Sequence, residues 1–353
     1  MNIGFCCATP YHLLLALRLA THEFKKDDKY LVIFEHFAGA KEVILKCKKL
    51  GVFKQVSSVD NLHQSQWKRR YHIFKLYDGL NDICSQIKFD KFIFFLLDPL
   101  TVSLAIKKIT RKNPCCEICL GEDGLGAYIE PEIYKYGLSR GKTKFWMKVT
   151  HRFQYLNAFK YHYLIRPEMI STKDTLIPRK ITPLDFSDFE FRNVVENIWG
   201  KQNLLKGDIL FLQQPFEEKV NRIENSIIQE LYDCCNRKSI LNIKLHPRTQ
   251  PLGIFKNKQH LIDQNLMYEL VSNELSKYKL IIGINSSALF TPFMLWGNVT
   301  SIMLLYKICK PKMDNENFEI FLLKFTKIYT EYGGKITVPN NMDEVKKQIT
   351  AIC

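Results

Sequence analysis

Two adjacent carboxylates, Glu122 and Asp123, stand between glycines directly after an apolar run, Cys115–Leu120. If that run is a strand of a parallel sheet, both carboxylates emerge at its carboxyl end, where open α/β sheets bind ligands. Glycine neighbours let the backbone approach a substrate closely. Two adjacent acids repel each other, which raises the pKa of one of them towards a value that suits a general base. An acidic surface turn has the same composition, so the pair by itself leaves both interpretations open.

A histidine, His246, ends a second apolar run, Ile240–Leu245, and precedes Pro247. The proline biases His246 towards an extended backbone, which holds the imidazole at the end of the strand. An imidazole can donate a hydrogen bond or a proton to a leaving phosphate, and Lys244 and Arg248 add positive charge beside it. A surface histidine beside a turn proline is the alternative interpretation.

Three polar residues, Asn285, Ser286 and Ser287, follow a third apolar run, Leu280–Ile284. Serine hydroxyls and the free N–H groups of a following helix form an anion site for phosphate, although ordinary helix capping uses the same residues. All three polar groups therefore stand at carboxyl ends of expected strands. In a two-domain α/β enzyme these ends face one cleft, so we expect the three groups to share one ligand site.

Short apolar runs alternate with segments of helical periodicity, and this pattern occurs twice around an irregular, aromatic-rich middle. The alternation predicts parallel sheets with helices on both faces. We expect two Rossmann-like domains, 1–190 on the acceptor side and 191–353 on the donor side. The expected strands are Asn2–Cys7, Tyr30–Phe34, Lys91–Leu97, Cys115–Leu120, Asp208–Leu212, Ile240–Leu245, Leu280–Ile284 and Val299–Leu305. The expected helices are Tyr11–Thr21, Ala40–Leu50, Val102–Ile109, Glu217–Asn236, Gln264–Leu275, Ser286–Leu295 and Met342–Ile352.

The composition of the 353 residues is that of a packed globular protein, with 46% hydrophobic and 25% charged residues. The 51 basic and 36 acidic side chains give a net charge of +15, which attracts polyanions and anionic membrane surfaces. The basic residues are scattered along the chain, so a nucleic acid, an anionic lipid leaflet and an anionic nucleotide sugar all stay open as partners. The sequence shows no helix-turn-helix, zinc-finger or RNP signature of a nucleic-acid-binding protein, so we expect no nucleic-acid partner.

The eleven cysteines predict free thiols, because their number is odd and the chain opens without a secretory signal. Cys116 and Cys119 form a single C-x-x-C beside Cys115, and no second pair with zinc-site spacing follows, so we expect buried strand thiols and no metal. No apolar run approaches the roughly 18 residues that span a bilayer. We expect a cytoplasmic protein, and a peripheral place on the inner face of the cytoplasmic membrane stays open. A homodimer also stays open.

The order of these motifs resembles that of bacterial sialyltransferases. An acidic pair before glycine, a later His-Pro and a Ser-Ser after the next strand are similar to the motif set of glycosyltransferase family 52, which is related to the bacterial polysialyltransferases. The opening Cys7–His12 and its Leu-rich helix are also similar, and the resemblance extends to about Leu295. It implies a GT-B fold, CMP-sialic acid as the donor, inversion at the anomeric carbon and no metal requirement. The implied acceptor is a terminal sugar, expected to be galactose, of a lipooligosaccharide or capsule.

The resemblance also implies a role for each motif residue. Glu122 would be the general base on the acceptor hydroxyl and Asp123 would orient it, while His246 would bind the CMP phosphate and act as the general acid. The remaining expected donor-side residues are Lys244, Pro247, Arg248, Asn285, Ser286 and Ser287, together with Thr9 and Pro10 in a first-domain loop that faces the sugar.

One position departs from the family pattern and leaves the base open. Some family members carry a candidate base in a Pro-Asp motif after the first strand of the second half, whereas here Phe216 follows the proline and Glu217 is the nearest carboxylate. Glu217 is therefore an alternative base.

Three other assignments stay open. The chain could be a polysialyltransferase or a glycerophosphotransferase of cell-surface polymer synthesis, although the latter usually carries an acid where Asn285 stands. A basic nucleic-acid-binding protein is the non-enzyme alternative.

Overall fold

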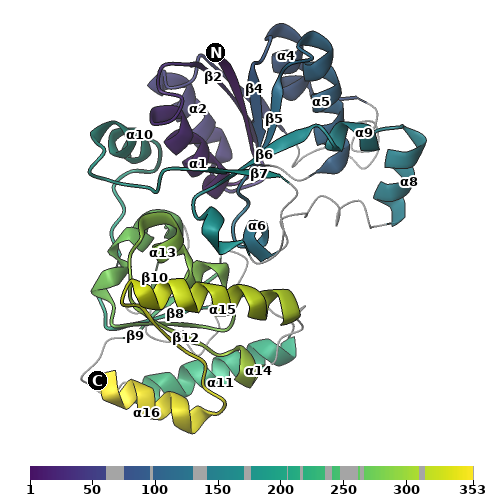
Figure 1. Cartoon of the computed structure of the whole chain (residues 1–353). Coiled ribbons are helices and arrows are strands. Elements are labelled where there is room, and N and C mark those ends of the chain that lie inside the picture. Colours follow the sequence, from purple (N-terminus) through teal and green to yellow (C-terminus); the bar gives the residue numbers. More distant parts are fainter. Residues whose placement is uncertain are drawn as a thin grey trace. The chain divides into compact units, whose positions relative to one another are not determined.

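The chain folds into two compact units, Met1–Gly200 and Lys201–Cys353, each built on a parallel sheet with helices on its faces (Figure 1). The expected α/β class with two Rossmann-like halves is confirmed. This computed structural model describes residues 1–60, 75–95, 98–129, 141–170, 176–204, 206–214, 218–234, 241–246, 261–262, 266–309 and 315–352.

The sheet of the first unit has seven parallel strands in the order β3-β2-β1-β4-β5-β6-β7. The strand order reverses between β1 and β4, and ligands of such sheets bind at the carboxyl ends beside a reversal. The strands are β1 (Asn2–Cys7), β2 (Asp28–Phe34), β3 (Gln55–Val59), β4 (Lys91–Phe94), β5 (Glu117–Gly121), β6 (Phe159–Leu164) and β7 (Ile177–Lys180).

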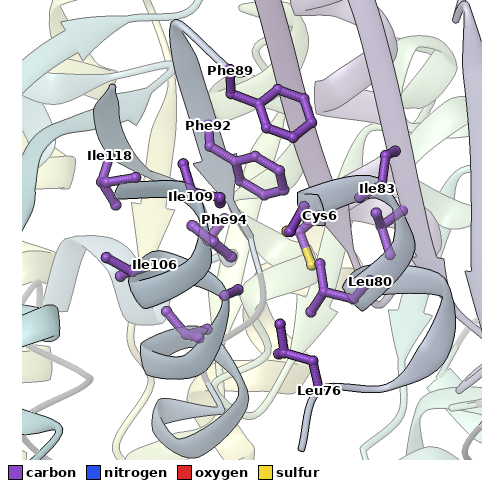
Figure 2. Packing of buried hydrophobic residues seen from close by; sticks show 14 of the residues in the cluster. Cys6, Leu76, Leu80, Ile83, Phe89, Phe92, Phe94, Ile106, Ile109 and Ile118 are labelled. Carbon is purple, nitrogen blue, oxygen red and sulfur yellow. The ribbon is translucent and has the colours of Figure 1, made fainter. Parts of the chain in front are cut away.

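Helices cover both faces of this sheet, α1 and α2 on one side and α4 and α5 on the other (Figure 1). On the second side Cys6, Phe92 and Phe94 of alternate strand positions pack against Leu80 and Ile106 of the helices (Figure 2). Because both faces are buried at the centre of the sheet, the strands β1, β4 and β5 read as mostly apolar runs in the sequence. The helices are α1 (Pro10–Thr21), α2 (Ala40–Leu50), α4 (Asp78–Gln86), α5 (Pro99–Lys112), α6 (Gly126–Ile129), α8 (Gly141–Val149), α9 (Phe153–Leu156), η1 (Pro167–Met169) and α10 (Phe189–Trp199).

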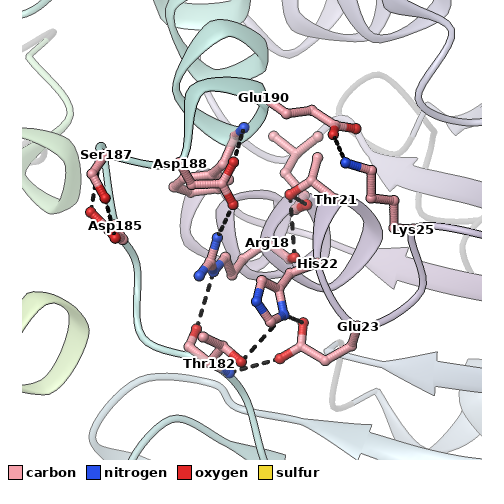
Figure 3. A network of polar contacts seen from close by, with 12 residues as sticks. Arg18, Thr21, His22, Glu23, Lys25, Thr182, Asp185, Ser187, Asp188 and Glu190 are labelled. Atoms are coloured by element: carbon pink, nitrogen blue, oxygen red, sulfur yellow. Dashed lines mark hydrogen bonds and ion pairs between the residues drawn. The ribbon is translucent and has the colours of Figure 1, made fainter.

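The last helix of the first unit, α10, packs against α1 and α2. Arg18 of α1 is 3% exposed and donates to Asp188 Oδ2 at 2.7 Å and to the Thr182 carbonyl at 3.3 Å (Figure 3). Its guanidinium also lies 5.3 Å from the centre of the Phe191 ring. Asp188 is in turn the N-cap of α10 and accepts the Phe191 N–H. We expected the domains to divide between residues 190 and 191; the compact unit extends to Gly200 because these contacts hold α10 on α1.

The sheet of the second unit has six parallel strands in the order β10-β9-β8-β11-β12-β13. Its order reverses between β8 and β11, so the carboxyl ends of these strands correspond to those of β1 and β4 in the first sheet. The strands are β8 (Ile209–Leu212), β9 (Leu241–Lys244), β10 (Leu261–Ile262), β11 (Leu280–Gly283), β12 (Ser301–Leu304) and β13 (Lys335–Thr337).

Two groups of helices cover the second sheet, α11, α14 and α16 on one face and α13 and α15 on the other (Figure 1). Phe290 and Phe293 stack edge-on against Phe325 of α15 and close that second face. The helices are α11 (Glu218–Cys234), α12 (Tyr268–Val271), η3 (Ser272–Lys277), η4 (Ser287–Leu289), α13 (Thr291–Trp296), α14 (Tyr306–Cys309), α15 (Asn315–Glu331) and α16 (Met342–Ile352). Within the described residues, no helix has both the length and the apolar character that a bilayer crossing requires.

Candidate active site

The paired carboxylates lie where the sequence predicts them, at the carboxyl end of β5. β5 ends at Gly121, and Glu122 and Asp123 follow directly. The carboxyl end of β1 carries Thr9, whose Oγ1 accepts the His12 N–H at 3.2 Å and caps α1. β1 and β5 both pair with β4, so the loops after them reach the same edge of the sheet.

Glu122 is buried, at 1% exposure, and both of its carboxylate oxygens accept hydrogen bonds. The Tyr11 hydroxyl donates to Oε1, the Tyr128 hydroxyl donates to Oε2 at 2.5 Å, and the Ile165 N–H donates to Oε2 at 2.9 Å. Burial raises the pKa of Glu122, and these three donors oppose the rise. Glu122 thus joins β5 to α1, α6 and the end of β6.

Asp123 differs from its neighbour because 40% of its side chain is exposed. His12 Nε2 lies 2.6 Å from Asp123 Oδ1, while His12 Nδ1 accepts the Ala8 N–H at 3.2 Å. Since a backbone N–H can only donate, the imidazole carries its proton on Nε2 and donates it to Asp123. The His12 ring is itself buried and stacks on Phe95, with ring centres 5.7 Å apart. The result is a partly exposed carboxylate that a buried imidazole orients.

The polar residues of the second unit gather at the ends of three adjacent strands, β9, β8 and β11. Lys244 is buried and ends β9, and the half-buried His246 follows it two residues later. Gln214, after β8, accepts the Asn285 N–H on its Oε1 at 3.4 Å and so joins the loops after β8 and β11. Two of the three predicted polar groups therefore share one edge of this sheet.

The serines of this edge differ in exposure. Ser286 is buried, and its Oγ accepts the Ala288 N–H at 3.2 Å, which is the capping role that the sequence left as the alternative. Ser287 is exposed. Pro247, Arg248 and Glu217 lie outside the described residues, so their roles stay predictions.

Several groups at these two edges have no recognisable pattern in the sequence. Tyr11, His12 and Tyr128 became visible as site residues only through their contacts with the acidic pair. In the second unit, Glu224 of α11 is fully buried, and its Oε1 accepts the Gln214 N–H at 3.3 Å. Burial raises the pKa of Glu224 to about 8, against the opposing effects of the Gln214 N–H and the Gln213 side chain. The helical periodicity of the sequence predicts α11, but it does not predict that Glu224 of this helix contacts the Gln214 N–H.

A further acid, Glu269 of α12, lies near Lys244. Burial raises the pKa of Glu269, and the Lys244 ammonium opposes that rise.

The strand thiols Cys116 and Cys119 are free and buried, which raises the pKa of each to about 12, whereas Cys115 is free and exposed. In the described part of the chain, no three His, Cys, Asp or Glu side chains come together as metal ligands.

The family model of the alpha-2,8-polysialyltransferases (POLYST) matches residues 5–305 of the chain. The chain belongs to this family. Both strand edges described above fall within the match, and the resemblance to bacterial sialyltransferases and polysialyltransferases drawn from the motifs is confirmed. As a member of the polysialyltransferase family the chain is a sialic-acid glycosyltransferase, which takes a nucleotide-sugar donor and a glycan acceptor.

Solved structures of glycosyltransferases share the fold of this polysialyltransferase family member. An alpha/beta-galactoside alpha-2,3-sialyltransferase from the luminous marine bacterium Photobacterium phosphoreum aligns with a TM-score of 0.56 at 15% identity, over 95% of this chain and 98% of that one. Arabidopsis thaliana UGT89C1 complexed with UDP-L-rhamnose aligns with a TM-score of 0.55 at 9% identity, over 99% and 89%. These identities establish the GT-B-like fold alone. No curated protein matches the chain.

A protein from Listeria monocytogenes that is described as a "putative UDP-N-acetylglucosamine 2-epimerase" aligns as well, with a TM-score of 0.58 at 12% identity, over 99% of this chain and 87% of that one. The same architecture therefore holds sugar nucleotides for different reactions, and the polysialyltransferase assignment depends on the family match rather than on the fold.

Replacing Gly121 with alanine is expected to disturb the acidic pair of this polysialyltransferase family member. An added Cβ would lie 2.3 Å from the Phe95 ring, which stacks on His12. We expect a loss of about 1–3 kcal/mol in the free energy of unfolding and a lower kcat, measured by thermal melting and a transfer assay. Gly124→Ala is the control. An alanine at position 124 would be strained at a φ of +64°, but its Cβ would meet no atom within 4 Å. Equal effects of the two variants would refute a special role for the Phe95 contact.

Proposed function

We propose that this member of the family is an inverting sialyltransferase that transfers sialic acid from CMP-sialic acid to a terminal hydroxyl of a bacterial surface glycan, without a metal. The observation that carries the proposal is the exposed Asp123 carboxylate, held by the buried His12 imidazole at the end of β5. A carboxylate placed in this way suits the removal of a proton from an acceptor hydroxyl.

The two carboxylates take different roles in this proposal. The family resemblance implies Glu122 as the base, but each oxygen of Glu122 accepts a hydrogen bond from a neighbour and the side chain is buried. The Asp123 side chain is 40% exposed, so we assign the base role to Asp123 and a positioning role to Glu122. The His12 N–H then holds one carboxylate oxygen, and the second can face the acceptor hydroxyl.

The donor side of the reaction belongs to the polar edge of the second unit. The acceptor oxygen forms a bond to the anomeric carbon while the bond from that carbon to the CMP phosphate oxygen breaks. A single displacement of this kind inverts the anomeric carbon. The acceptor proton passes to Asp123, and His246 donates a proton or a hydrogen bond to the departing phosphate, with Lys244 adding positive charge. Because the leaving group is already a phosphate monoester, an imidazole can supply the stabilisation that a metal gives a diphosphate.

Replacing His246 with alanine is expected to lower both the affinity for CMP and the rate of transfer. The imidazole stabilises a phosphate that is bound in the ground state and gains charge in the transition state, so we expect kcat to fall by about 100-fold. Calorimetric titration with CMP and steady-state kinetics measure the two effects separately. Wild-type values for both would remove His246 from the donor site.

The acceptor has two candidates. Sequence analysis expected galactose at the end of a lipooligosaccharide or capsule, and the Photobacterium phosphoreum enzyme of similar fold is named as a galactoside sialyltransferase. The family name, in contrast, favours a glycan that already ends in sialic acid and receives another through an alpha-2,8 linkage. The second candidate function is therefore polysialic acid synthesis.

Formation of a homodimer stays a prediction.

A transfer assay tests the proposal directly. The whole chain is incubated with galactose-terminated and sialic-acid-terminated oligosaccharides, each with CMP-sialic acid, a UDP-sugar or CDP-glycerol as donor, and with EDTA in parallel. We expect product from CMP-sialic acid alone, undiminished by EDTA, with NMR showing the inverted anomer. Transfer from CDP-glycerol or a UDP-sugar instead, or a strict metal requirement, would overturn the proposed reaction, and the preferred acceptor separates the two candidates.

A further inference from the structure

The helix α8 has an unusual outward face. Phe145 and Val149 stand one turn apart and are 60% and 52% exposed, and the exposed Lys144 and Lys148 lie beside them. The opposite side of the helix is anchored, because Met147 is fully buried and its Sδ lies 3.9 Å from Ser103 Oγ of α5. We call Lys144, Phe145, Lys148 and Val149 the α8 face.

Helical geometry explains why this face points away from the unit. Residues four apart lie on one side of a helix, whereas Met147, two residues from Phe145 and from Val149, lies on the other. Figure 1 shows α8 at the periphery of the first unit, beyond α5 and α9. The anchoring side is thus used for packing, and the α8 face is left outside.

The sequence around the α8 face is strongly basic. Among the described residues, no carboxylate forms an ion pair with Lys144 or Lys148. In the sequence no Asp or Glu stands between Glu132 and Glu168. The same stretch contains the basic residues Lys135, Arg140, Lys142, Lys144, Lys148, Arg152, Lys160 and Arg166. The positive charge of the α8 face is therefore not neutralised by its neighbours in the chain.

We propose that the α8 face docks on the surface of an anionic phospholipid membrane. Exposed apolar side chains between lysines match such a surface, because the apolar groups enter the acyl boundary while the ammonium groups contact lipid phosphates. A second copy of the chain fits less well, since a two-fold contact of this face would bring lysines against lysines. A soluble polyanion would use the lysines but leaves the exposure of Phe145 and Val149 unexplained. Surface docking needs no transmembrane helix.

The test is sedimentation of the whole chain with vesicles. We expect binding to vesicles of phosphatidylglycerol and phosphatidylethanolamine, weaker binding at high salt, and little binding to phosphatidylcholine alone. Phe145→Ser combined with Val149→Ser is expected to lower the vesicle partition coefficient about tenfold. Lys144→Gln and Lys148→Gln are each expected to lower it about fivefold.

A matched control lies on the other unit. Leu323 of α15 is 74% exposed, but Glu316 and Glu319 offset Lys324 and Lys327 on that helix, so Leu323→Ser is expected to leave vesicle binding unchanged. Vesicle binding that survives the Phe145/Val149 double substitution, or that falls equally with Leu323→Ser, would overturn the proposal. If the lysine variants lose vesicle binding but the Phe145/Val149 variant keeps it, the membrane proposal is also overturned. The face would then be assigned to a soluble polyanion.

Membrane docking and the proposed reaction can fail separately. The α8 variants lie outside both strand edges of the candidate site, so we expect each to transfer sialic acid to a soluble acceptor at the wild-type rate. An inactive wild-type chain that still binds anionic vesicles through the α8 face would refute the proposed reaction and support docking. An active chain without vesicle binding would do the reverse.

Discussion

Asparagine in place of Asp123 is expected to lower kcat for sialyl transfer by about 1,000-fold while leaving CMP binding unchanged. An amide cannot take the acceptor proton, and general base catalysis contributes about 10²–10⁴-fold. The substitution keeps the size of the side chain, and the amide oxygen can still accept the His12 Nε2–H. A fall in kcat with an unchanged dissociation constant for CMP therefore separates the loss of the base from a loss of structure.

Glu122→Gln is the matched control for the base assignment. An amide nitrogen at position 122 would face at least one of three donors, the Tyr11 hydroxyl, the Tyr128 hydroxyl or the Ile165 N–H, so about 1–3 kcal/mol of stability is expected to be lost. Its kcat, measured where the protein remains folded, is expected to fall far less than that of Asp123→Asn. The reverse order, a well-folded inactive Glu122→Gln and an active Asp123→Asn, would return the base role to Glu122, as the sequence first suggested.

Glutamine in place of Glu224 is expected to stabilise the second unit, and the gain depends on pH. The pKa of Glu224 rises from the ordinary 4.5 to about 8 in the folded chain because the carboxyl is buried. Between these values the folded chain binds more protons than the unfolded chain, so stability falls as pH rises through this window. Below pH 4.5 the group imposes no cost, and above pH 8 the full cost remains, on the order of 5 kcal/mol.

The hydrogen bonds around Glu224 argue in the same direction. Glu224 Oε2 and Gln213 Oε1 are both buried, and neither has a hydrogen-bond partner among the described residues. A glutamine at position 224 would keep an oxygen for the Gln214 N–H. The isosteric change thus removes a buried charge and keeps the hydrogen bond that joins α11 to the loop after β8.

Urea unfolding of the two proteins between pH 5 and pH 9 measures this effect. The midpoint of the Glu224→Gln variant is expected to exceed that of the wild type increasingly as pH rises to about 8, and then by a constant amount. Glu230 on the same helix is the control: it pairs with Lys346 at 3.0 Å near the surface, so Glu230→Gln is expected to change stability by less than about 1 kcal/mol. A pH-independent difference between wild type and Glu224→Gln would show that the carboxyl is not buried as described.

Aromatic and edge strands were beyond sequence reasoning, and the reason is physical. β6 is rich in aromatic and polar residues, from Phe159 to Leu164, and β7 is an exposed edge strand that contains Pro178. Neither shows the continuous apolar run by which buried parallel strands are found. The edge strand β7 lacks a second neighbour and tolerates proline, whereas β6 lies between β5 and β7 and mixes Lys160 and His162 with aromatic residues. The expected helix Ser286–Leu295 likewise divides into η4 and α13, with Pro292 in the first turn of α13.

The sequence by itself determined the α/β class, the strands of both sheet centres and the position of the polar groups at their carboxyl ends. These features are local, because a strand buried on both faces must be apolar throughout and the residue that follows it leaves the core. The tertiary structure alone decided which of two adjacent carboxylates is exposed. That choice depends on Tyr11 and His12, 111 positions before Glu122 and Asp123 respectively, and on Ile165, 43 positions after Glu122. Hydrogen bonds across such separations are set by chain topology, which no local pattern contains.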